Sequence, residues 1–187
     1  MDISEAIYHR RSVRAYTPVA VTRGLIDALV AAAVHAPSAM NLQPWAFIVA
    51  EGRELLSLCA GRAKRHLVET IEPNSPLAHY REQLSDPAFD IFYGAPALIV
   101  IAATSDAAQS AEDCCMATQN LLLAAYGMGL GACCIGFARP WFNLPEIKAE
   151  LGIPESLVPV VPIVVGHPSS TAARVPRREP AIHWVRP

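Results

Sequence analysis

The chain has 187 residues, of which 52% are hydrophobic and 17% are charged, and its formal net charge is −2. This length predicts one domain over residues 1–187, with a sizeable core. The near-neutral charge gives no basis for broad electrostatic binding to nucleic acid or to an anionic membrane. The charged fraction lies below the usual quarter, which indicates a further buried surface such as a dimer interface, unless abundant alanine alone accounts for it.

The cysteines and histidines form neither a disulfide framework nor a metal pattern. Five cysteines occur as two adjacent pairs and one single residue, without C-x-x-C spacing. Buried free thiols in a reducing compartment fit this arrangement best. There is no H-E-x-x-H motif, and the N-terminus lacks the apolar stretch of a signal peptide. We therefore expect a cytoplasmic protein without a metal site.

The N-terminal segment is predicted to be a short helix followed by clustered positive charge. Asp2 or Ser4 is placed to cap this helix. The helix dipole favours cations at a helix C-terminus, which explains one arginine there but explains three around a hydroxyl less well. Guanidinium groups match phosphate oxygens through paired hydrogen bonds, so the cluster predicts an anion site. Its members are Arg10, Arg11, Ser12 and Arg14.

A second helix leads to a loop framed by prolines. Thr22 is predicted to cap this helix, and Pro37 to end it. Pro37 and Pro44 restrict the backbone and remove two N–H donors, so we expect a stiff loop. An ordinary helix-to-strand connection would explain Trp45 as a core residue. The polar side chains between the prolines suit a flat polar heterocycle instead, and they belong to Ser38, Asn41 and Gln43.

The remaining chain is predicted to alternate between helices and apolar strands. Helices are expected over residues 51–66, 110–127 and 146–151, and strands over 45–50, 97–102, 133–136 and 158–165. Ser110–Asp113 resembles a capping box, and Asn143 is placed to cap the last helix. Pro159 and Pro162 indicate that the last strand lies at an edge or contains a bulge. Prolines also break residues 70–93.

No charged residue occurs between Cys114 and Ala138. A membrane span needs about 20 predominantly apolar residues, but Gln119 and Asn120 interrupt this stretch and Gly127 ends the helix. A helix that is uncharged on nearly all sides must be surrounded by protein, which indicates contact with a second subunit. The glycines that follow lie after a predicted helix and before a predicted strand. This order is the reverse of a dinucleotide-binding fingerprint and indicates a helix C-cap and turn.

Taken together, these segments resemble one known family. Arg10-Arg11-Ser12-Val13-Arg14, followed by Pro37-Ser38-Ala39-Met40-Asn41-Leu42-Gln43-Pro44-Trp45, is similar to the opening of the nitroreductase-like, FMN-dependent oxidoreductases. Gly94-Ala95-Pro96-Ala97, residues 119–125, Cys134-Ile135-Gly136-Phe137 and Arg177-Arg178-Glu179-Pro180 continue the resemblance in family order. The ordered set covers nearly the whole chain and is specific for the family, although not for a substrate.

The resemblance implies an α+β, nitroreductase-like fold. A central sheet, mostly antiparallel or mixed, would be flanked by helices, and two chains would form an intertwined homodimer with FMN at the interface. The C-terminal tail, residues 169–187, would pack on the partner through Ile182 and Trp184. These expectations come from the family and from the apolar character of the two anchors.

The resemblance also implies roles for particular residues. The phosphate and ribityl chain would be held by Arg10, Ser12 and Arg178, with Arg177 as the alternative to Arg178. Arg11, at a position where the family often varies, is also counted among the cofactor-binding residues. Arg14 would face the N1/O2 edge of the flavin, where a fixed cation stabilises the negative charge of the reduced ring. From the other subunit, Pro37, Ser38 and Asn41 would approach the ring. Backbone groups of Ile135 and Gly136 would lie near N5.

No nucleophile–base pair and no paired carboxylates stand out, which fits a protein whose cofactor carries the chemistry. The resemblance implies that FMN accepts hydride from NADH or NADPH and reduces nitroaromatic, quinone or similar acceptors by a ping-pong mechanism. Alternatives within the family are flavin cleavage, dehalogenation or dehydrogenation. Outside that class, the chain would be a flavin-binding or storage module without turnover, or a structural dimer with solvated arginines.

Overall fold

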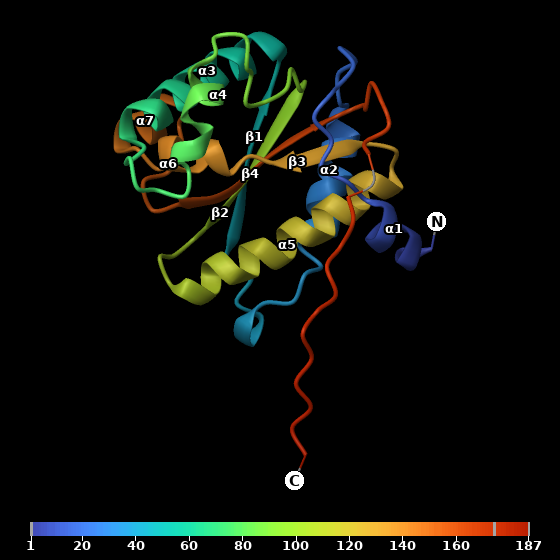
Figure 1. The fold of residues 1–187 in the computed structure, drawn as a ribbon. Coiled ribbons are helices and arrows are strands. Elements are labelled where there is room, and N and C mark those ends of the chain that lie inside the picture. The colour runs from blue at the N-terminus through green and yellow to red at the C-terminus, as the bar shows by residue number, and fades with distance from the viewer. Residues whose placement is uncertain (1, 174, 187) are drawn as a thin grey trace.

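Helices and strands alternate along a computed structural model, which describes residues 2–173 and 175–186 (Figure 1). The α-helices are α1 (Ile3–His9), α2 (Arg23–Ala33), α3 (Arg53–Thr70), α4 (Arg81–Ser85), α5 (Ala108–Gly127), α6 (Arg139–Phe142) and α7 (Pro145–Glu150). The strands are β1 (Trp45–Glu51), β2 (Ala97–Ala103), β3 (Gly131–Cys134) and β4 (Val158–Gly166). Short 3-10 helices are η1 (Ala39–Asn41), η2 (Ala78–Tyr80) and η3 (Gly136–Ala138).

The four strands form one sheet in the order β1-β2-β4-β3. Each neighbouring pair is antiparallel, so the sheet takes the antiparallel form of the prediction. Beside the β3 edge, a parallel backbone bridge joins Ser12 to Ala132. The sheet therefore extends at this edge towards the predicted anion site.

Alternation along β2 divides the core into two layers. All seven residues of β2 are buried. Leu98 and Val100 pack in the layer of α3 and α6, whereas Ile99 and Ile101 pack in the layer of α2 and α5. Successive strand residues point to opposite faces, so a strand covered on both sides has a nearly continuous apolar sequence. In Figure 1, α3, α4, α6 and α7 lie on one side of the sheet and α2 and α5 on the other.

The positions of two strands differ from the sequence-based expectation. β1 was expected to be buried from its apolar sequence, but it lies at the sheet edge and its side chains are half-buried or exposed. β4 lies inside the sheet although it carries Pro159 and Pro162. Its register shifts where Ile101 pairs with Val161 and Ala102 pairs with Pro159. The bulge alternative is therefore confirmed and the edge alternative is wrong, because a bulge tolerates a missing N–H donor.

The predicted capping box of α5 is wrong. The helix begins at Ala108, so Ser110 and Asp113 lie within it. Both side chains are buried. The Ser110 hydroxyl shares a hydrogen bond with the Ser105 hydroxyl at 2.8 Å. The two residues thus form part of the interior face of α5, and Asp113 has a partner elsewhere in the chain.

Of the cap predictions for two other helices, one is confirmed and the other is wrong. The Thr22 hydroxyl accepts a hydrogen bond from the Leu25 N–H and caps α2 as predicted. The Asn143 side chain instead donates to the carbonyls of Arg139 and Pro159, at 2.9 Å each. It therefore joins α6 to β4 and does not cap α7.

The first helix leaves apolar side chains uncovered. In α1 only Ala6 is buried, while Ile3, Ile7 and Tyr8 are exposed. Asp2 occupies the N-cap position without a side-chain hydrogen bond. Most of the apolar side chains of this helix are therefore left exposed by the described chain.

The segment after α1 is attached to the end of the sheet by backbone hydrogen bonds. The Val13 N–H donates to the Ala132 carbonyl at 3.1 Å, and the Thr17 N–H donates to the His167 carbonyl at 2.8 Å. A Cβ atom at Gly131 would lie 2.7 Å from the Val13 side chain, so only glycine permits this close approach. Residues 12–17 thus lie between β3 and the chain that follows β4.

The longest helix, α5, presents an uncharged outer surface from Cys115 onward, which includes the exposed Met116 and Gln119. Within residues 2–173 and 175–186, no helix is long and apolar enough to cross a membrane. The helix ends as predicted, because Gly129 has a φ of 73° and its N–H donates to the Tyr126 carbonyl at 3.0 Å.

Candidate cofactor site

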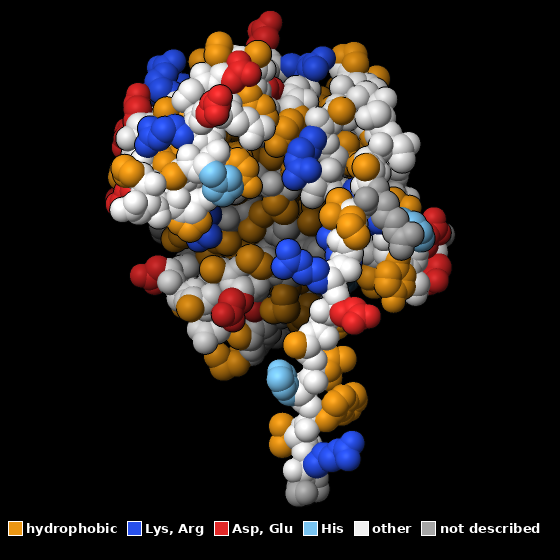
Figure 2. Space-filling model, in the orientation of Figure 1, with side chains coloured by type: hydrophobic (Ala, Val, Ile, Leu, Met, Phe, Trp, Pro, Cys, Tyr) orange, Lys and Arg blue, Asp and Glu red, His pale blue; other side chains and the backbone are white. Residues whose placement is uncertain are grey.

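Arginine side chains surround a cavity of about 300 Å³ between the segment after α1 and the start of the C-terminal tail. Its lining contains no acidic residue and consists of Arg10, Arg11, Ser12, Arg14, Ala172, Ala173, Val175 and Arg177. In Figure 2, basic side chains border a hollow with a hydrophobic floor, above the point where the tail leaves the body. We call Arg10, Ser12, Arg14 and Arg177 the arginine cradle.

Among the described residues, the guanidinium groups of the cradle have no carboxylate partner. In the part of the chain that the structure describes, the ion pair within 4 Å joins Arg62 to Glu150, away from this cavity. Like charges that converge repel each other unless an anion lies between them. Four arginines around one cavity whose described lining has no acid are therefore the arrangement expected of an anion-binding site.

Arg11 differs from its neighbours in the cluster. Its Nη1 donates to the Tyr8 carbonyl at 2.9 Å and to the Arg10 carbonyl at 2.7 Å. These carbonyls lie at the C-terminal end of α1, where cations are favoured. The helix-dipole interpretation thus applies to Arg11, and the anion interpretation to Arg10 and Arg14.

Arg14 also contacts an aromatic residue from the end of the proline-broken segment over residues 70–93. Its guanidinium lies 5.9 Å from the centroid of the Tyr93 ring, within range of a cation–π interaction. Burial raises the pKa of Tyr93, and the Arg14 charge offsets part of that shift. Burial likewise raises the pKa of the Cys133 thiol, with Arg14 acting in the opposite direction. Arg14 therefore lies beside Tyr93 and Cys133 and also lines the cavity.

The proline-framed loop has an unusual backbone. Met40, Asn41 and Gln43 have φ values of 51°, 55° and 50°. In the described ranges the remaining non-glycine residue with positive φ is Tyr93, at 56°. Such conformations cost of the order of 1–3 kcal/mol each and concentrate at functional sites. The positive-φ residues thus lie in the proline-framed loop and at Tyr93, the aromatic contact of Arg14.

Hydrogen bonds hold this loop in place. Ser38 Oγ accepts from the Gln43 N–H at 2.9 Å, and Gln43 Nε2 donates to Asn41 Oδ1 at 3.3 Å. The Ala39 N–H donates to both carboxyl oxygens of Asp113, at 3.2 and 3.3 Å. Asp113 is the residue of this site that the sequence reasoning missed. The available signal was an acid on the interior face of a predicted helix.

The cradle and the loop lie near opposite ends of α5. The loop contacts Asp113, whereas Arg10 borders a cavity that is also lined by Leu122 and Tyr126. The helical rise from Asp113 to Tyr126 corresponds to about 20 Å. In Figure 1 the light-blue turn after α2 lies below α5, away from the segment that follows α1. One chain therefore does not bring Pro37, Ser38 and Asn41 to the cradle.

The backbone after β3 turns from the sheet into η3. The Ile135 N–H donates to the Pro162 carbonyl at 2.8 Å and is thus engaged in the sheet. Gly136 is exposed and begins η3. Beside it, the Phe137 ring packs edge-on against Tyr80, with the ring centroids 5.4 Å apart. Residues 70–93, which the sequence left uninterpreted, thus supply an aromatic side chain close to Gly136.

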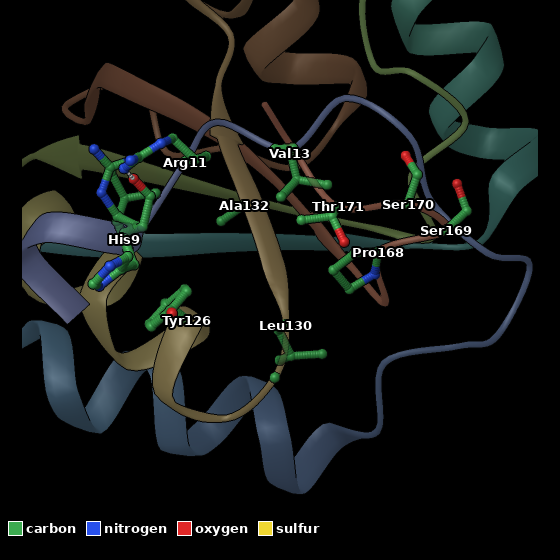
Figure 3. A pocket seen from close by; sticks show the side chains of 14 residues that line it. His9, Arg11, Val13, Tyr126, Leu130, Ala132, Pro168, Ser169, Ser170 and Thr171 are labelled. Carbon is green, nitrogen blue, oxygen red and sulfur yellow. Dashed lines mark hydrogen bonds between the residues drawn. The ribbon is translucent and has the colours of Figure 1, made fainter. Parts of the chain in front are cut away.

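A larger cavity of about 660 Å³ adjoins the cradle, because both cavities share Arg10 and Arg11. Figure 3 shows His9 and Arg11 at one end of it, Leu130 and Ala132 beside the floor, and Ser169–Thr171 at the other end. The volume is in the range of pockets that hold small organic ligands. The cavity lined by the arginine cradle and the larger, partly apolar cavity therefore lie next to each other.

The tail begins at the cradle and then leaves the body (Figure 1). Arg177 lines the cavity, whereas Arg178 is not among the lining residues. Ile182 and Trp184 are 65% and 81% exposed. No group of three His, Cys, Asp or Glu side chains within residues 2–173 and 175–186 is arranged to hold a metal ion.

Comparison with known proteins agrees with this arrangement. The model of the "Nitroreductase family" matches residues 7–167. A protein of Methanothermobacter thermautotrophicus named "Putative NADH dehydrogenase/NAD(P)H nitroreductase" is 34% identical over 173 residues, which are 90% of this chain and 78% of that protein. A crystal structure of a nitroreductase with bound FMN from Bacteroides fragilis matches with a TM-score of 0.82 and 26% identity over 100% of both chains. The predicted fold is therefore confirmed.

More distant relatives are named for different reactions. An FMN reductase (NADPH) of Bacillus subtilis is 28% identical over 182 residues, covering 92% of this chain and 68% of that protein. An iodotyrosine deiodinase of Thermotoga neapolitana is 27% identical over 157 residues, covering 80% of each. The similarity thus extends across reductases and a dehalogenating enzyme.

Proposed function

The chain belongs to the nitroreductase family, and from that premise we propose that it is an FMN-dependent oxidoreductase. It takes electrons from NADH or NADPH and passes them to nitroaromatic, quinone or similar acceptors. The observation that carries this proposal is the arginine cradle, whose guanidinium groups have no acidic partner and adjoin a cavity of about 660 Å³. A phosphate group attached to a flat aromatic ring fits that combination of charge and space.

The cofactor is FMN, which is also bound in the similar Bacteroides fragilis structure. Arg10, Ser12 and Arg177 hold the phosphate, with Arg178 as the alternative to Arg177 once the tail is fixed. Guanidinium–phosphate pairs combine charge with directed hydrogen bonds. Arg11 stays bonded to carbonyl groups at the end of α1 and thereby helps to fix the backbone that carries its neighbours.

Arg14 faces the edge of the ring on which negative charge develops during reduction. A fixed cation stabilises that charge without rearrangement, because its position is set before the reaction. Its contact with Tyr93 restricts the guanidinium to one side of the cavity. The affinity of the site for the reduced ring should therefore exceed its affinity for the oxidised ring.

A second copy of the chain completes the site. Pro37, Ser38 and Asn41 lie about 20 Å along α5 from the cradle of their own chain, so they meet the ring bound by the partner. The uncharged surface of α5, the exposed α1 side chains and the tail anchors Ile182 and Trp184 supply the apolar contact. The functional unit is thus a homodimer with two equivalent sites.

The chain's own groups bind and orient the reactants. When bound, FMN supplies the hydride and electron transfer for which no side chain here is suited. Gly136, exposed at the start of η3, would supply the backbone donor near the ring, and the Phe137 ring next to it packs edge-on against Tyr80. The space beside this N–H would accommodate flat substrates. Because NAD(P)H and the acceptor use this one space in turn, the kinetics are ping-pong. Steady-state patterns that require both substrates bound together would contradict the mechanism.

The test is a visible spectrum of the purified protein, taken anaerobically before and after addition of NADH or NADPH. A bound flavin whose colour is bleached supports the cofactor and the reductase activity together. A bound flavin that stays oxidised favours a binding module without turnover. Protein that is colourless and does not take up added FMN would overturn the proposal.

Dehalogenation is the second candidate, because an iodotyrosine deiodinase is among the relatives. The segment over residues 71–93 bears on this choice. Arg81 donates to the carbonyls of Val68 and Ile71, and Lys64 donates to that of Phe89 at 2.7 Å. This segment is therefore attached to α3 instead of forming a free lid, which favours small flat acceptors. Mixing reduced protein with nitrobenzene or with 3-iodotyrosine, and comparing the two reoxidation rates, distinguishes the candidates.

A further inference from the structure

Asp113 is a buried acid with an incomplete set of hydrogen bonds. Its exposed fraction is 2%. Both carboxyl oxygens accept from one donor, the Ala39 N–H, and no other donor reaches them within the described residues. Burial of a carboxyl group is unfavourable unless its acceptor sites are filled. A single backbone N–H fills them poorly, so the residue is not explained by the stability of the core.

The neighbouring residue of α5 contacts the other end of the same loop. The Cys114 thiol lies 3.9 Å from the Pro44 carbonyl, which also accepts from the Thr104 N–H at 3.1 Å. Adjacent positions of one 20-residue helix thus reach both ends of the proline-framed loop. A long helix packed against the sheet is a rigid support for such contacts.

Side-chain packing contributes little to holding the loop in its strained form, which leaves the hydrogen bonds within the loop and the one to Asp113. Met40 and Leu42 are 87% and 64% exposed, so their side chains add almost no packing. Met40, Asn41 and Gln43 all have positive φ, which extended or helical alternatives would avoid. The conformation therefore depends on a few hydrogen bonds, and the one from Ala39 to Asp113 directly precedes the strained residues.

We propose that Asp113 is a positioning residue for the cofactor. By holding the Ala39 N–H, it keeps Pro37–Pro44 in the shape that meets FMN bound by the second copy. This inference rests on the proposed function. It adds a residue that touches neither FMN nor substrate and acts through a loop backbone 74 positions away in the sequence.

The test compares Asp113→Ala and Asp113→Asn with Ser110→Ala, which removes another buried polar group from the interior of α5 without touching the loop. Hydrogen bonds to an acidic group predict that Asp113→Ala weakens FMN binding about 10- to 100-fold. Asp113→Asn retains one acceptor oxygen, so the loss should stay below about fivefold, and Ser110→Ala should bind FMN like the wild type. Fluorescence quenching on titration with FMN measures each affinity.

A second substitution separates positioning from general damage. Glycine adopts positive φ without steric cost, so Met40→Gly should restore FMN affinity in the Asp113→Ala protein by about fivefold. A residue that served only the core would not be rescued from the loop. Absence of rescue, or equal FMN affinity of wild type and Asp113→Ala, would overturn the inference alone.

The remaining outcomes are also decisive. Wild-type protein that binds no FMN would overturn the proposed function and this inference together. If Asp113→Ala does not fold, Asp113→Asn carries the test. Loss of folding in both variants, with Ser110→Ala intact, would assign Asp113 to stability and contradict the positioning role.

Discussion

The two long helices cover opposite faces of one sheet, but only α3 presents a charged outer surface. Its charged residues are Arg53, Glu54, Arg62, Lys64, Arg65 and Glu69. In α5 the charged residues are Glu112 and Asp113, and Asp113 is buried. Water solvates the outside of α3, whereas the exposed side of α5 is better suited to contact with protein. The exposed apolar residues of α1 adjoin α5, so the incomplete side of the molecule is also the side of the candidate site.

The largest effect should come from placing a charge on the outer surface of α5. In a symmetric dimer one substitution places two like charges near the same axis, which costs several kcal/mol. We expect Gln119→Glu to weaken dimerisation by at least about 100-fold and to release FMN, as measured by sedimentation and flavin absorbance. The matched control is Leu58→Glu on the exposed side of α3. Equal dimer stability in both variants would remove the distinction between the helices.

The next effect concerns the cradle. Arg10→Ala should weaken FMN binding about 10- to 100-fold by removing a charge-assisted contact, while riboflavin, which has no phosphate, should bind with unchanged affinity. Arg65→Ala on α3 is the control for loss of one exposed positive charge. Arg11→Ala should change FMN affinity less than about threefold, because this side chain bonds to α1 carbonyls. An Arg11 effect equal to that of Arg10 would contradict the division between them.

Arg14→Ala should alter the reduction potential of bound FMN as well as its affinity. Loss of the fixed cation weakens binding of the reduced form more than of the oxidised form. A tenfold difference between those losses corresponds to a potential about 30 mV more negative for a two-electron couple. Potentiometric titration of the holoprotein measures this shift, with Arg65→Ala again as control. An unchanged potential would exclude the electrostatic role of Arg14.

The smallest effect should be the change in thermal stability on removal of an exposed ion pair of α3. The Arg62 guanidinium bonds to Glu150 and lowers the pKa of that carboxyl group. A lowered pKa in the folded state stabilises the protein at neutral pH, and this stabilisation is lost as the pH falls through the folded-state pKa. Glu150→Gln should therefore lower Tm slightly at pH 7 and not at about pH 3. Because the pair is exposed, the difference should be near the limit of calorimetry.

The sequence predicted the elements of the fold better than their positions. Apolar β-branched runs identified β2 and β4, and the uncharged stretch identified α5 to its final glycine. The edge position of β1 and the interior position of β4 depend on strand order, which is a property of distant pairing and not of local pattern. Pro159 lies beside the register shift in the β2–β4 pairing, where a missing N–H donor is tolerated.

The candidate site shows the same division. Arg10, Ser12 and Arg14 are close in sequence, so their common cavity was predictable from the sequence alone. The partner of Asp113 is 74 positions away, and an acid near a helix start was more simply interpreted as a cap. The positive φ of Met40 could not be predicted from the residue type, because methionine has no preference for that conformation. Contacts that depend on the folded chain were therefore the ones missed.

The attachment of residues 12–17 to Ala132 and to residues 167–169 has a consequence for synthesis of the protein. Residues 12–17 leave the ribosome early in translation. Their backbone partners emerge only after most of the chain has been made. At about 5–20 residues per second, this delay amounts to roughly 10–30 s. During that time β2 also lacks β4, which lies next to it in the completed sheet. Nascent chains should therefore need protection from aggregation, and flavin uptake should occur only after translation ends.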